Sequence, residues 1–232
     1  EAAIRAAPRA ADLTHQMLAY SGRGRFIVKR LNLSDLVDEN AHLFRASIAR
    51  TAALDLRLDR GLPAVEADAG QVQQVVMNLI TNAAEATGDA PGTITLSTGV
   101  LDCSGADLGR SRLHEKPPPG RFAYVEVADT GCGMDDETQQ RMFDPFFTTK
   151  LTGRGLGMAA VQGIVRGHRG ALFLDSAPGR GTVIRVLFPL AAGPVEEGLP
   201  SSAPGGAAAA EAPPMRGLVL LVDDEEVVRE SS

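Results

Sequence analysis

The 232-residue sequence has no tryptophan, two tyrosines and only two cysteines, and this scarcity narrows what the chain can be. Cys103 and Cys132 lack the spacing of metal ligands, so a cysteine-based zinc site is not expected. A chain so poor in cysteine is typical of reduced, cytosolic chemistry. We interpret Cys132, which lies between two glycines, as an incidental small residue.

Long apolar runs are also absent. No stretch approaches the length of a membrane span, and no signal peptide is present. The chain begins with Glu1 in an expected helix rather than with methionine, so these absences describe this fragment only. We expect a cytoplasmic location, and membrane attachment of a longer parent protein stays open.

The chain has no strong excess of one charge either. Its net charge is −6, and both signs are interspersed, which argues against a surface for nucleic acid or anionic lipid. Apolar residues make up 44% of the sequence, enough for a true core. The length allows one domain of ordinary size with shorter segments at each end.

Periodicity of apolar residues predicts a mixed α/β domain. Helical spacing favours helices at 1–21, 36–50, 71–86, 135–142 and 156–166. Alternation favours strands at 54–59, 64–67, 93–98, 123–127, 171–176 and 182–188. Ser34 or Asp35 is the expected N-cap of the second helix, and Asp68 that of the third. The polar, proline-rich stretch 102–120 is predicted to be an exposed and variable hairpin excursion.

Three separated motifs carry the chemistry. The helix 71–86 places Asn78 and Asn82 four positions apart, so their carboxamides share one face. Asp129 ends the strand at 123–127 and is followed by two glycines within four residues. The glycine-rich turn 153–157 opens into a helix, where free backbone N–H groups favour phosphate.

Each motif alone is weak, but their combination and order are specific. Together with the segment 143–150, which reads FDPFFTTK, they resemble the N, G1, F and G2 boxes of the histidine-kinase branch of the Bergerat-fold ATPases. The resemblance covers about residues 31–190. It implies a two-layer α/β sandwich with a mixed sheet and helices on one face, which binds Mg²⁺ and ATP.

The resemblance also implies roles for individual residues. Asp129 would accept the exocyclic amine of adenine, and Asn82, whose amide oxygen suits a hard cation, would hold Mg²⁺. Lys150 and Arg154, at the two ends of a short lid, would counter charge on the phosphates. The expected catalytic residues are Asn78, Asn82 and Lys150. The expected nucleotide contacts are Asn78, Asn82, Glu85, Asp129, Gly131, Gly133, Met134, Phe143, Lys150, Gly153, Arg154, Gly155, Leu156, Gly157 and Thr182.

Asn78 separates the possible activities. In hydrolysing relatives such as gyrase, the equivalent position is a glutamate that activates water, whereas an amide cannot act as a general base. We therefore predict transfer of the γ-phosphoryl group of ATP to a protein histidine. An ATP-hydrolysing conformational clamp and a non-catalytic nucleotide-sensing module are the alternatives. Phe143, Phe146 and Phe147 are expected to anchor the lid.

The flanking segments complete the expected organisation. Residues 1–30 resemble the end of a dimerisation domain, 191–216 form a flexible linker, and 217–232 resemble the start of a truncated receiver. His15 lacks the following acid and proline of a phosphoacceptor, so the acceptor histidine is expected upstream. The fragment should bind ATP without phosphorylating itself. The implied partners are that histidine, a receiver aspartate and a second copy of the full-length protein.

Overall fold

The computed structural model describes residues 27–48, 52–88, 90–150 and 155–191. The predicted helix 1–21 with His15, the linker 192–216 and the segment 217–232 lie outside the described residues. So do Gly153 and Arg154. The assignments of those segments therefore stay predictions, and the following description concerns the domain between Ile27 and Ala191.

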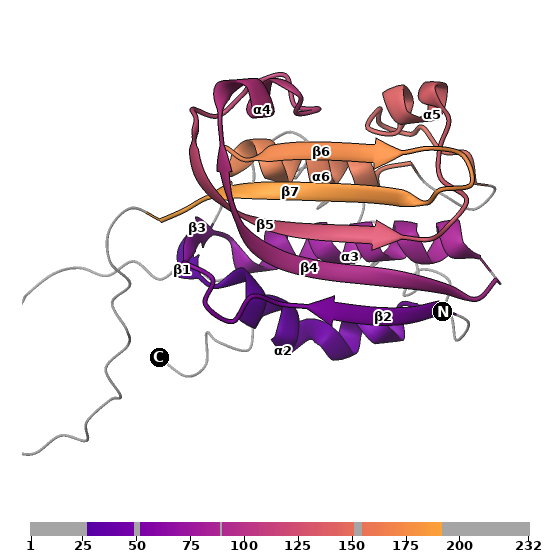
Figure 1. Ribbon diagram of the computed structural model, residues 1–232, viewed down its shortest axis with the longest axis horizontal. Helices are drawn as coiled ribbons and strands as arrows, with labels where there is room; N and C mark the ends of the chain where they lie inside the picture. The colour runs from indigo at the N-terminus through magenta and orange to yellow at the C-terminus, as the bar shows by residue number, and fades with distance from the viewer. Residues whose placement is uncertain (1–26, 49–51, 89, 151–154, 192–232) are drawn as a thin grey trace, which may run out of the picture. The chain divides into compact units, whose positions relative to one another are not determined.

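A five-stranded mixed sheet forms one layer of this domain, in the order β2-β4-β5-β7-β6 (Figure 1). The β2 strand pairs parallel with β4, and the other neighbours are antiparallel. The strands are β2 (Ala52–Arg57), β4 (Gly92–Cys103), β5 (Gly120–Asp129), β6 (Ala171–Ser176) and β7 (Thr182–Pro189). The predicted α/β sandwich is confirmed, with β4 and β5 longer than alternation indicated.

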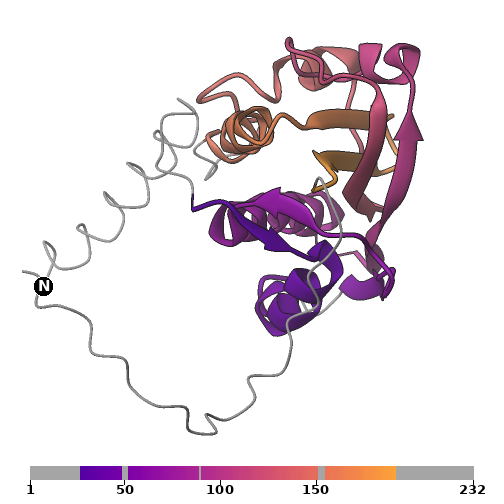
Figure 2. The same ribbon diagram turned by 90° about the vertical axis from the view of Figure 1, so that its left-hand side faces the viewer.

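Three helices form the second layer on one face of the sheet (Figure 2). They are α2 (Leu33–Ala46), α3 (Ala69–Thr87) and α6 (Gly157–Gly167). Each turns an apolar stripe toward the sheet, as Val72, Val75, Leu79 and Ile80 do on α3, where they are at most 2% exposed. The core between the layers fixes α3 and α6 beside the end of β5.

A small second sheet joins the two ends of the described domain. The strand β1 (Lys29–Leu31) pairs antiparallel with β3 (Val65–Ala67). On the other side of β3, Val65 forms a bridge with Leu190, and the Ala191 N–H donates to the Ala64 carbonyl at 2.9 Å. The chain therefore enters and leaves the domain along the same short strand, which leads directly into α3.

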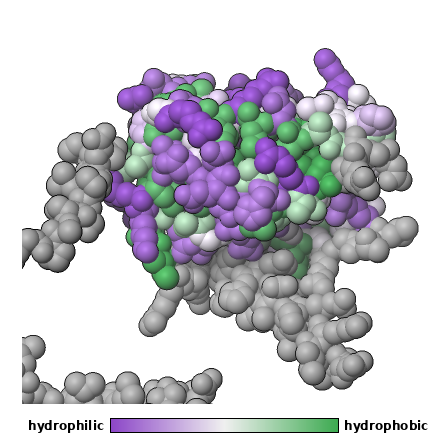
Figure 3. Space-filling view, turned by 90° about the horizontal axis from the view of Figure 1, so that it is seen from below, coloured by the Kyte–Doolittle hydropathy of each residue, from purple (hydrophilic) through white to green (hydrophobic). Residues whose placement is uncertain are grey.

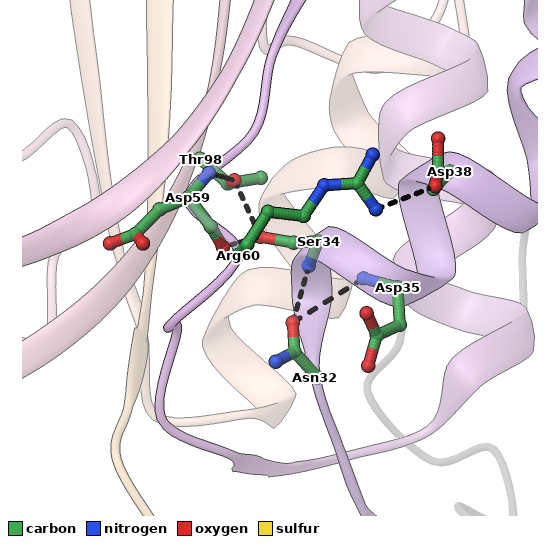
Figure 4. A network of polar contacts seen from close by, with 7 residues as sticks. All are labelled: Asn32, Ser34, Asp35, Asp38, Asp59, Arg60 and Thr98. Atoms are coloured by element: carbon green, nitrogen blue, oxygen red, sulfur yellow. Dashed lines mark hydrogen bonds and ion pairs between the residues drawn. The ribbon is translucent and has the colours of Figure 1, made fainter.

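The start of α2 corrects one sequence prediction. Asn32, rather than Ser34 or Asp35, is the N-cap, and its side chain accepts from the N–H groups of both residues (Figure 4). Ser34 is buried instead, with its hydroxyl 2.6 Å from the Asp59 carbonyl oxygen and 2.7 Å from the Thr98 hydroxyl. The helix accordingly begins three residues earlier than predicted and ends at Ala46.

The excursion between β4 and β5 is mostly exposed, as its composition predicted, but it is folded and contributes a few buried side chains. It contains α4 (Gly105–Gly109), whose N-cap Ser104 forms a capping box with Asp107. Leu108 packs against Phe122 and Leu187 on the sheet face opposite the three long helices. Further along, the Arg112 N–H donates to the Leu172 carbonyl at 2.7 Å, so the excursion also covers the edge of β6.

Because Leu108 is 1% exposed, its truncation should destabilise the domain. We expect Leu108→Ala to lower the free energy of unfolding by about 2–4 kcal/mol, the usual cost of removing a buried leucine side chain. Leu43→Ala, on the outer side of α2, is the control, since Leu43 is 38% exposed. Urea unfolding of both variants measures the difference, and equal costs would show that α4 does not contribute to the core.

The face seen in Figure 3 mixes hydrophilic and apolar side chains. Among the described residues, no helix is both long and apolar enough to cross a membrane.

The short helix α5 (Asp136–Arg141) follows β5, with Asp135 as its N-cap. It matches the predicted helix 135–142 and lies at the end of the sheet near β6 and β7 (Figure 1). With α3, β5 and α6 it surrounds the main cleft of the described domain.

Candidate functional site

The cleft has a volume of about 660 Å³ and is bounded by α3, the end of β5, the start of α5 and the start of α6. Most of the predicted site residues line it: Asn78, Asn82, Glu85, Asp129, Gly133, Met134, Lys150, Gly155, Leu156, Gly157 and Thr182. Gly131 and Phe143 lie behind its wall, while Gly153 and Arg154 are outside the described residues.

The two asparagines of α3 differ in their contacts. The Asn78 side-chain amide donates to the Gly157 carbonyl oxygen at 3.2 Å, which ties the middle of α3 to the start of α6. Asn82, one turn further along, is half-buried and lines the cleft. Its amide has no hydrogen-bond partner in the described part of the chain. Asn82 is therefore available to a ligand, whereas Asn78 already holds two elements together.

Asp129 lies at the bottom of the cleft, half-buried at the end of β5. Burial raises the pKa of this carboxyl above 3.8, against the opposing effects of the Gly131 and Thr182 N–H groups and the Lys150 ammonium. One oxygen, Oδ1, accepts from the Gly131 N–H at 2.8 Å. The Thr182 N–H also favours the charged carboxyl, which lines the cleft and can accept from a ligand that donates a proton, such as an amine.

The glycines around Asp129 are required by close backbone approach. At Gly131, a Cβ would lie 2.6 Å from the Ala86 carbonyl oxygen, and at Gly133, with φ +66°, it would lie 1.9 Å from the Ala177 oxygen. At Gly181, with φ +74°, a Cβ would lie 1.9 Å from the backbone carbonyl oxygen of Asp129. Only glycine fits these positions, because L-residues disfavour positive φ and any side chain would collide.

A network of hydroxyl hydrogen bonds stabilises the cleft around Met134 and Thr182. Its central residue, Ser176, was not among the site residues predicted from the sequence. Ser176 Oγ accepts from the Met134 N–H at 3.0 Å and lies 2.9 Å from the hydroxyl of Thr182. The Gln139 side chain donates to the backbone oxygens of Met134 and Ser176 at 3.1 and 2.9 Å. These contacts join α5, β6 and β7, and no local sequence signal shows that they meet.

The part of the cleft formed by the start of α6 is suited to negative charge. The helix α6 starts here and has no side-chain N-cap, in contrast to α2, α3, α4 and α5. Its first N–H groups therefore have no side-chain cap, its first residues line the cleft, and the helix dipole adds positive potential there. Lys150 lines the same region and forms an ion pair with Glu85 of α3.

The three phenylalanines predicted to anchor a lid have different positions. Phe143 is buried in the main core, so it supports the cleft from behind and does not line it. Phe147 lines the cleft, with the Arg141 guanidinium 4.4 Å from its ring centroid. Phe146 is 63% exposed, with φ 68°, so its side chain does not pack in the core. Its backbone N–H donates to the Gly155 carbonyl oxygen at 2.9 Å, and its role as a lid anchor stays a prediction.

Apolar residues that the sequence analysis missed give the cleft room for a flat ring. Met142 follows α5, Met158 belongs to the first turn of α6, and Ile184 comes from β7. All three line the cleft together with the predicted polar residues. Residues of this kind are ordinary core positions by sequence pattern, so only their tertiary placement distinguishes them.

A protein-family model described as Histidine kinase-, DNA gyrase B-, and HSP90-like ATPase matches residues 67–192. The chain belongs to this family. The matched residues run from the end of β3 through β7 and include every residue described above as lining the cleft.

Individual relatives agree with this assignment. Sensor kinase CckA of Brucella abortus is 34% identical over 231 residues, which cover 96% of this chain and 24% of that protein. This chain thus spans about a quarter of the length of that relative.

Solved structures have the same fold. The nucleotide-free catalytic domain of histidine kinase ThkA matches with a TM-score of 0.55 and 28% identity, over 70% of this chain and 95% of that one. Full-length ShkA, in complex with AMPPNP, matches with a TM-score of 0.61 and 23% identity, over 79% and 36%. The described domain is a histidine kinase ATP-binding domain, in agreement with the predicted resemblance.

Proposed function

We propose that this domain binds ATP with Mg²⁺ and transfers the γ-phosphoryl group to a histidine side chain of a dimerisation domain. The observation that carries the proposal is the cleft itself, which is lined both by the half-buried carboxyl of Asp129 and by the start of α6, a helix without a side-chain N-cap. A nucleotide triphosphate has the matching chemistry, with an amine on its base and negative charge at its other end.

The base end favours adenine over guanine. The Asp129 carboxyl can accept a hydrogen bond from the exocyclic amine of adenine, whereas guanine presents a carbonyl oxygen there. Met142, Met158 and Ile184 provide apolar surface for the ring. Thr182, which pairs with Asp129 across β5 and β7, places a hydroxyl beside the same edge of the base.

The phosphate end fits a nucleotide bound with Mg²⁺. This ion takes few protein ligands and keeps phosphate oxygens and waters for its other positions, so the single amide oxygen of Asn82 is a suitable ligand. When bound, Mg²⁺ would neutralise negative charge on the phosphates. The N–H groups at the start of α6 and the Lys150 ammonium would hold the remaining phosphate oxygens.

The residues of the cleft suit transfer better than hydrolysis. A neutral imidazole nitrogen attacks the γ-phosphorus, and the bond from that phosphorus to the bridging oxygen breaks, which releases ADP. The nucleophile brings its own lone pair, so no general base is needed. Asn78 cannot serve as one, and its amide donates to Gly157. The gyrase-type conformational clamp is therefore not favoured.

The partners follow from this reaction. We propose that the acceptor histidine belongs to a dimerisation domain, that two full-length copies associate through it, and that a receiver aspartate takes the phosphoryl group next. The predicted receiver strand at 217–232 is consistent with a hybrid kinase. A cytoplasmic location fits the ATP supply and the reduced cysteines, Cys103 and Cys132.

The test is transfer to a separately produced dimerisation domain that contains an acceptor histidine. With Mg²⁺ and γ-labelled ATP, the chain should form an acid-labile phosphoryl product on that domain. We expect Asn82→Ala to lower the transfer rate by about 100-fold, as loss of one charge-stabilising contact does at other active sites. Asn40→Ala, on α2 and away from the cleft, is the matched control.

Three other outcomes would contradict this proposal or the role that it gives to Asn82. Rapid ATP hydrolysis without any acceptor would support the conformational clamp instead. Tight binding of ATP with no transfer to the restored acceptor would support a nucleotide-sensing module. Equal transfer by Asn82→Ala and the unsubstituted chain would show that Asn82 is not the magnesium ligand.

A further inference from the structure

We infer that His168 is a positioning residue for the nucleotide cleft, an inference that rests on the proposed nucleotide binding. His168 is the C-cap of α6 and is 8% exposed, packed edge-on against the Phe188 ring with centroids 5.8 Å apart. Its Nε2 lies 3.0 Å from the backbone nitrogen of Asp68, the N-cap of α3. The imidazole thus joins the end of one cleft helix to the start of the other.

The partners of the ring define its orientation. The Asp68 N–H is a donor, so Nε2 accepts from it. The other nitrogen, Nδ1, lies 2.8 Å from the Ile164 carbonyl oxygen and donates its N–H to it. The Asp68 N–H lies outside the helical ladder of α3 and has Nε2 as its acceptor. His168 is therefore held in one orientation by hydrogen bonds at both ring nitrogens.

A second contact joins the middle of α3 to the start of α6. The Asn78 amide donates to the Gly157 carbonyl at the start of α6. Asn78 lies about 15 Å along α3 from Asp68, and α6 is about 16 Å long, at 1.5 Å per residue. The helices are therefore antiparallel and tied at two points, one near the cleft and one remote from it. These two contacts together prevent α6 from sliding along α3 and from rotating against it.

The nucleotide contacts depend on that alignment. Asn82 belongs to α3, whereas the phosphate-facing N–H groups belong to the first turn of α6. Both must be placed together for a bound phosphate to reach them. A shift of α6 along α3 would separate them and would also break the Asn78 contact. The hydrogen bond between His168 and Asp68 thus acts on the cleft through the two helices, although His168 itself is not among the residues that line the cleft.

Asp68 adds a connection to the start of the domain. Its Oδ2 accepts from the Ile27 N–H at 2.8 Å, and its Oδ1 from the Gln71 N–H at 3.1 Å. The residue therefore holds the incoming chain, the first turn of α3 and the last turn of α6 at one point. Loss of the His168 contact should release α6 from this junction while the N-cap of α3 remains.

Two substitutions separate the two hydrogen bonds of the ring. The amide oxygen of a glutamine can occupy the place of Nε2, so His168→Gln keeps the acceptor for Asp68 N–H. The amide nitrogen of an asparagine can occupy the place of Nδ1, so His168→Asn keeps only the bond to Ile164. Both variants lose the ring contact with Phe188, and both should unfold at similarly lowered temperatures.

The full chain and both variants would be titrated calorimetrically with AMPPNP and Mg²⁺. We expect His168→Asn to bind about threefold to tenfold more weakly, the equivalent of one lost hydrogen bond, and His168→Gln to bind within about twofold of the unsubstituted chain. Hydrogen exchange without nucleotide should show faster exchange at Met158 to Val161 in the asparagine variant only.

The outcomes separate this inference from the proposed function. Failure of the unsubstituted chain to bind would overturn the proposed function, whereas the exchange rates would still test the tie. Equal exchange and affinity in the two variants, or losses that follow only their unfolding temperatures, would overturn the positioning role of His168.

Discussion

Asp129→Asn is expected to weaken ATP binding by about 100-fold, the largest loss that a single isosteric change in this cleft should cause. Asparagine can keep its oxygen at the Gly131 N–H, where Asp129 Oδ1 accepts at 2.8 Å. Its NH₂ group then takes the place of Oδ2 and faces the adenine amine, so that two donors meet. Calorimetric titration with AMPPNP and Mg²⁺ measures the loss.

The same titration with GTP is the control. Guanine presents a carbonyl oxygen where adenine has its amine, so an asparagine NH₂ should not weaken GTP binding further. If the affinities for ATP and GTP fall equally, the substitution has disrupted the cleft itself and not only its preference for adenine. Unchanged ATP binding would place adenine elsewhere.

Asp129→Asn should also leave the fold as stable or more stable at neutral pH. Burial raises the pKa of Asp129 above 3.8, so the folded state binds this proton more tightly than the unfolded state does. The residue's favourable contribution is complete below 3.8 and is lost as pH rises through the raised pKa. At pH ~7 the charge is therefore a cost that asparagine removes. Thermal unfolding without nucleotide should show this advantage shrinking as pH falls toward the unfolded-state value.

Gly181→Ala is the second change with a large expected effect, and it acts on stability. A Cβ at this position would lie 1.9 Å from the Asp129 carbonyl oxygen, while φ is +74°. Backbone cannot yield as a flexible side chain can, so β5 and β7 would have to separate beside the cleft. We expect the free energy of unfolding to fall by more than about 3 kcal/mol, in the range of severe overpacking and backbone strain.

Gly179→Ala isolates the part of this cost that comes from φ alone. Gly179 has nearly the same φ, +72°, but a Cβ there would meet nothing within 4 Å. Its substitution should cost about 1 kcal/mol, the usual penalty of a left-handed conformation. Guanidinium unfolding of both variants gives the comparison, and equal costs would show that the approach to Asp129 is not rigid.

Local chemistry predicted much of this fold correctly. Asp68 is confirmed as an N-cap because it stands alone before a clear apolar pattern. The cap of α2 was ambiguous, since Asn32, Ser34 and Asp35 are all good caps in succession. The choice is decided by Asp59 and Thr98, which lie far away in the sequence and draw Ser34 inward.

The candidate site likewise contains residues that the sequence could predict and residues that it could not. Asn78, Asn82, Asp129 and the glycines could be predicted because the motifs that hold them occur in the order that resembles the boxes of the family. Ser176 and Gln139 could not, since their value depends on β6, β7 and α5 meeting at one end of the sheet. The same limit concealed Leu108, whose polar surroundings in the sequence hide a buried side chain.

Val65 pairs with Leu31 on one side and forms a bridge with Leu190 on the other. This arrangement would allow the order of the segments along the chain to be changed while the fold is kept. Because the incoming and outgoing chains run along the same strand, their ends lie at one corner of the domain. A circular permutant could join residue 191 to residue 27 through a short flexible peptide and open the chain between β4 and β5 instead. Every strand pairing and the whole nucleotide cleft would be conserved in such a protein.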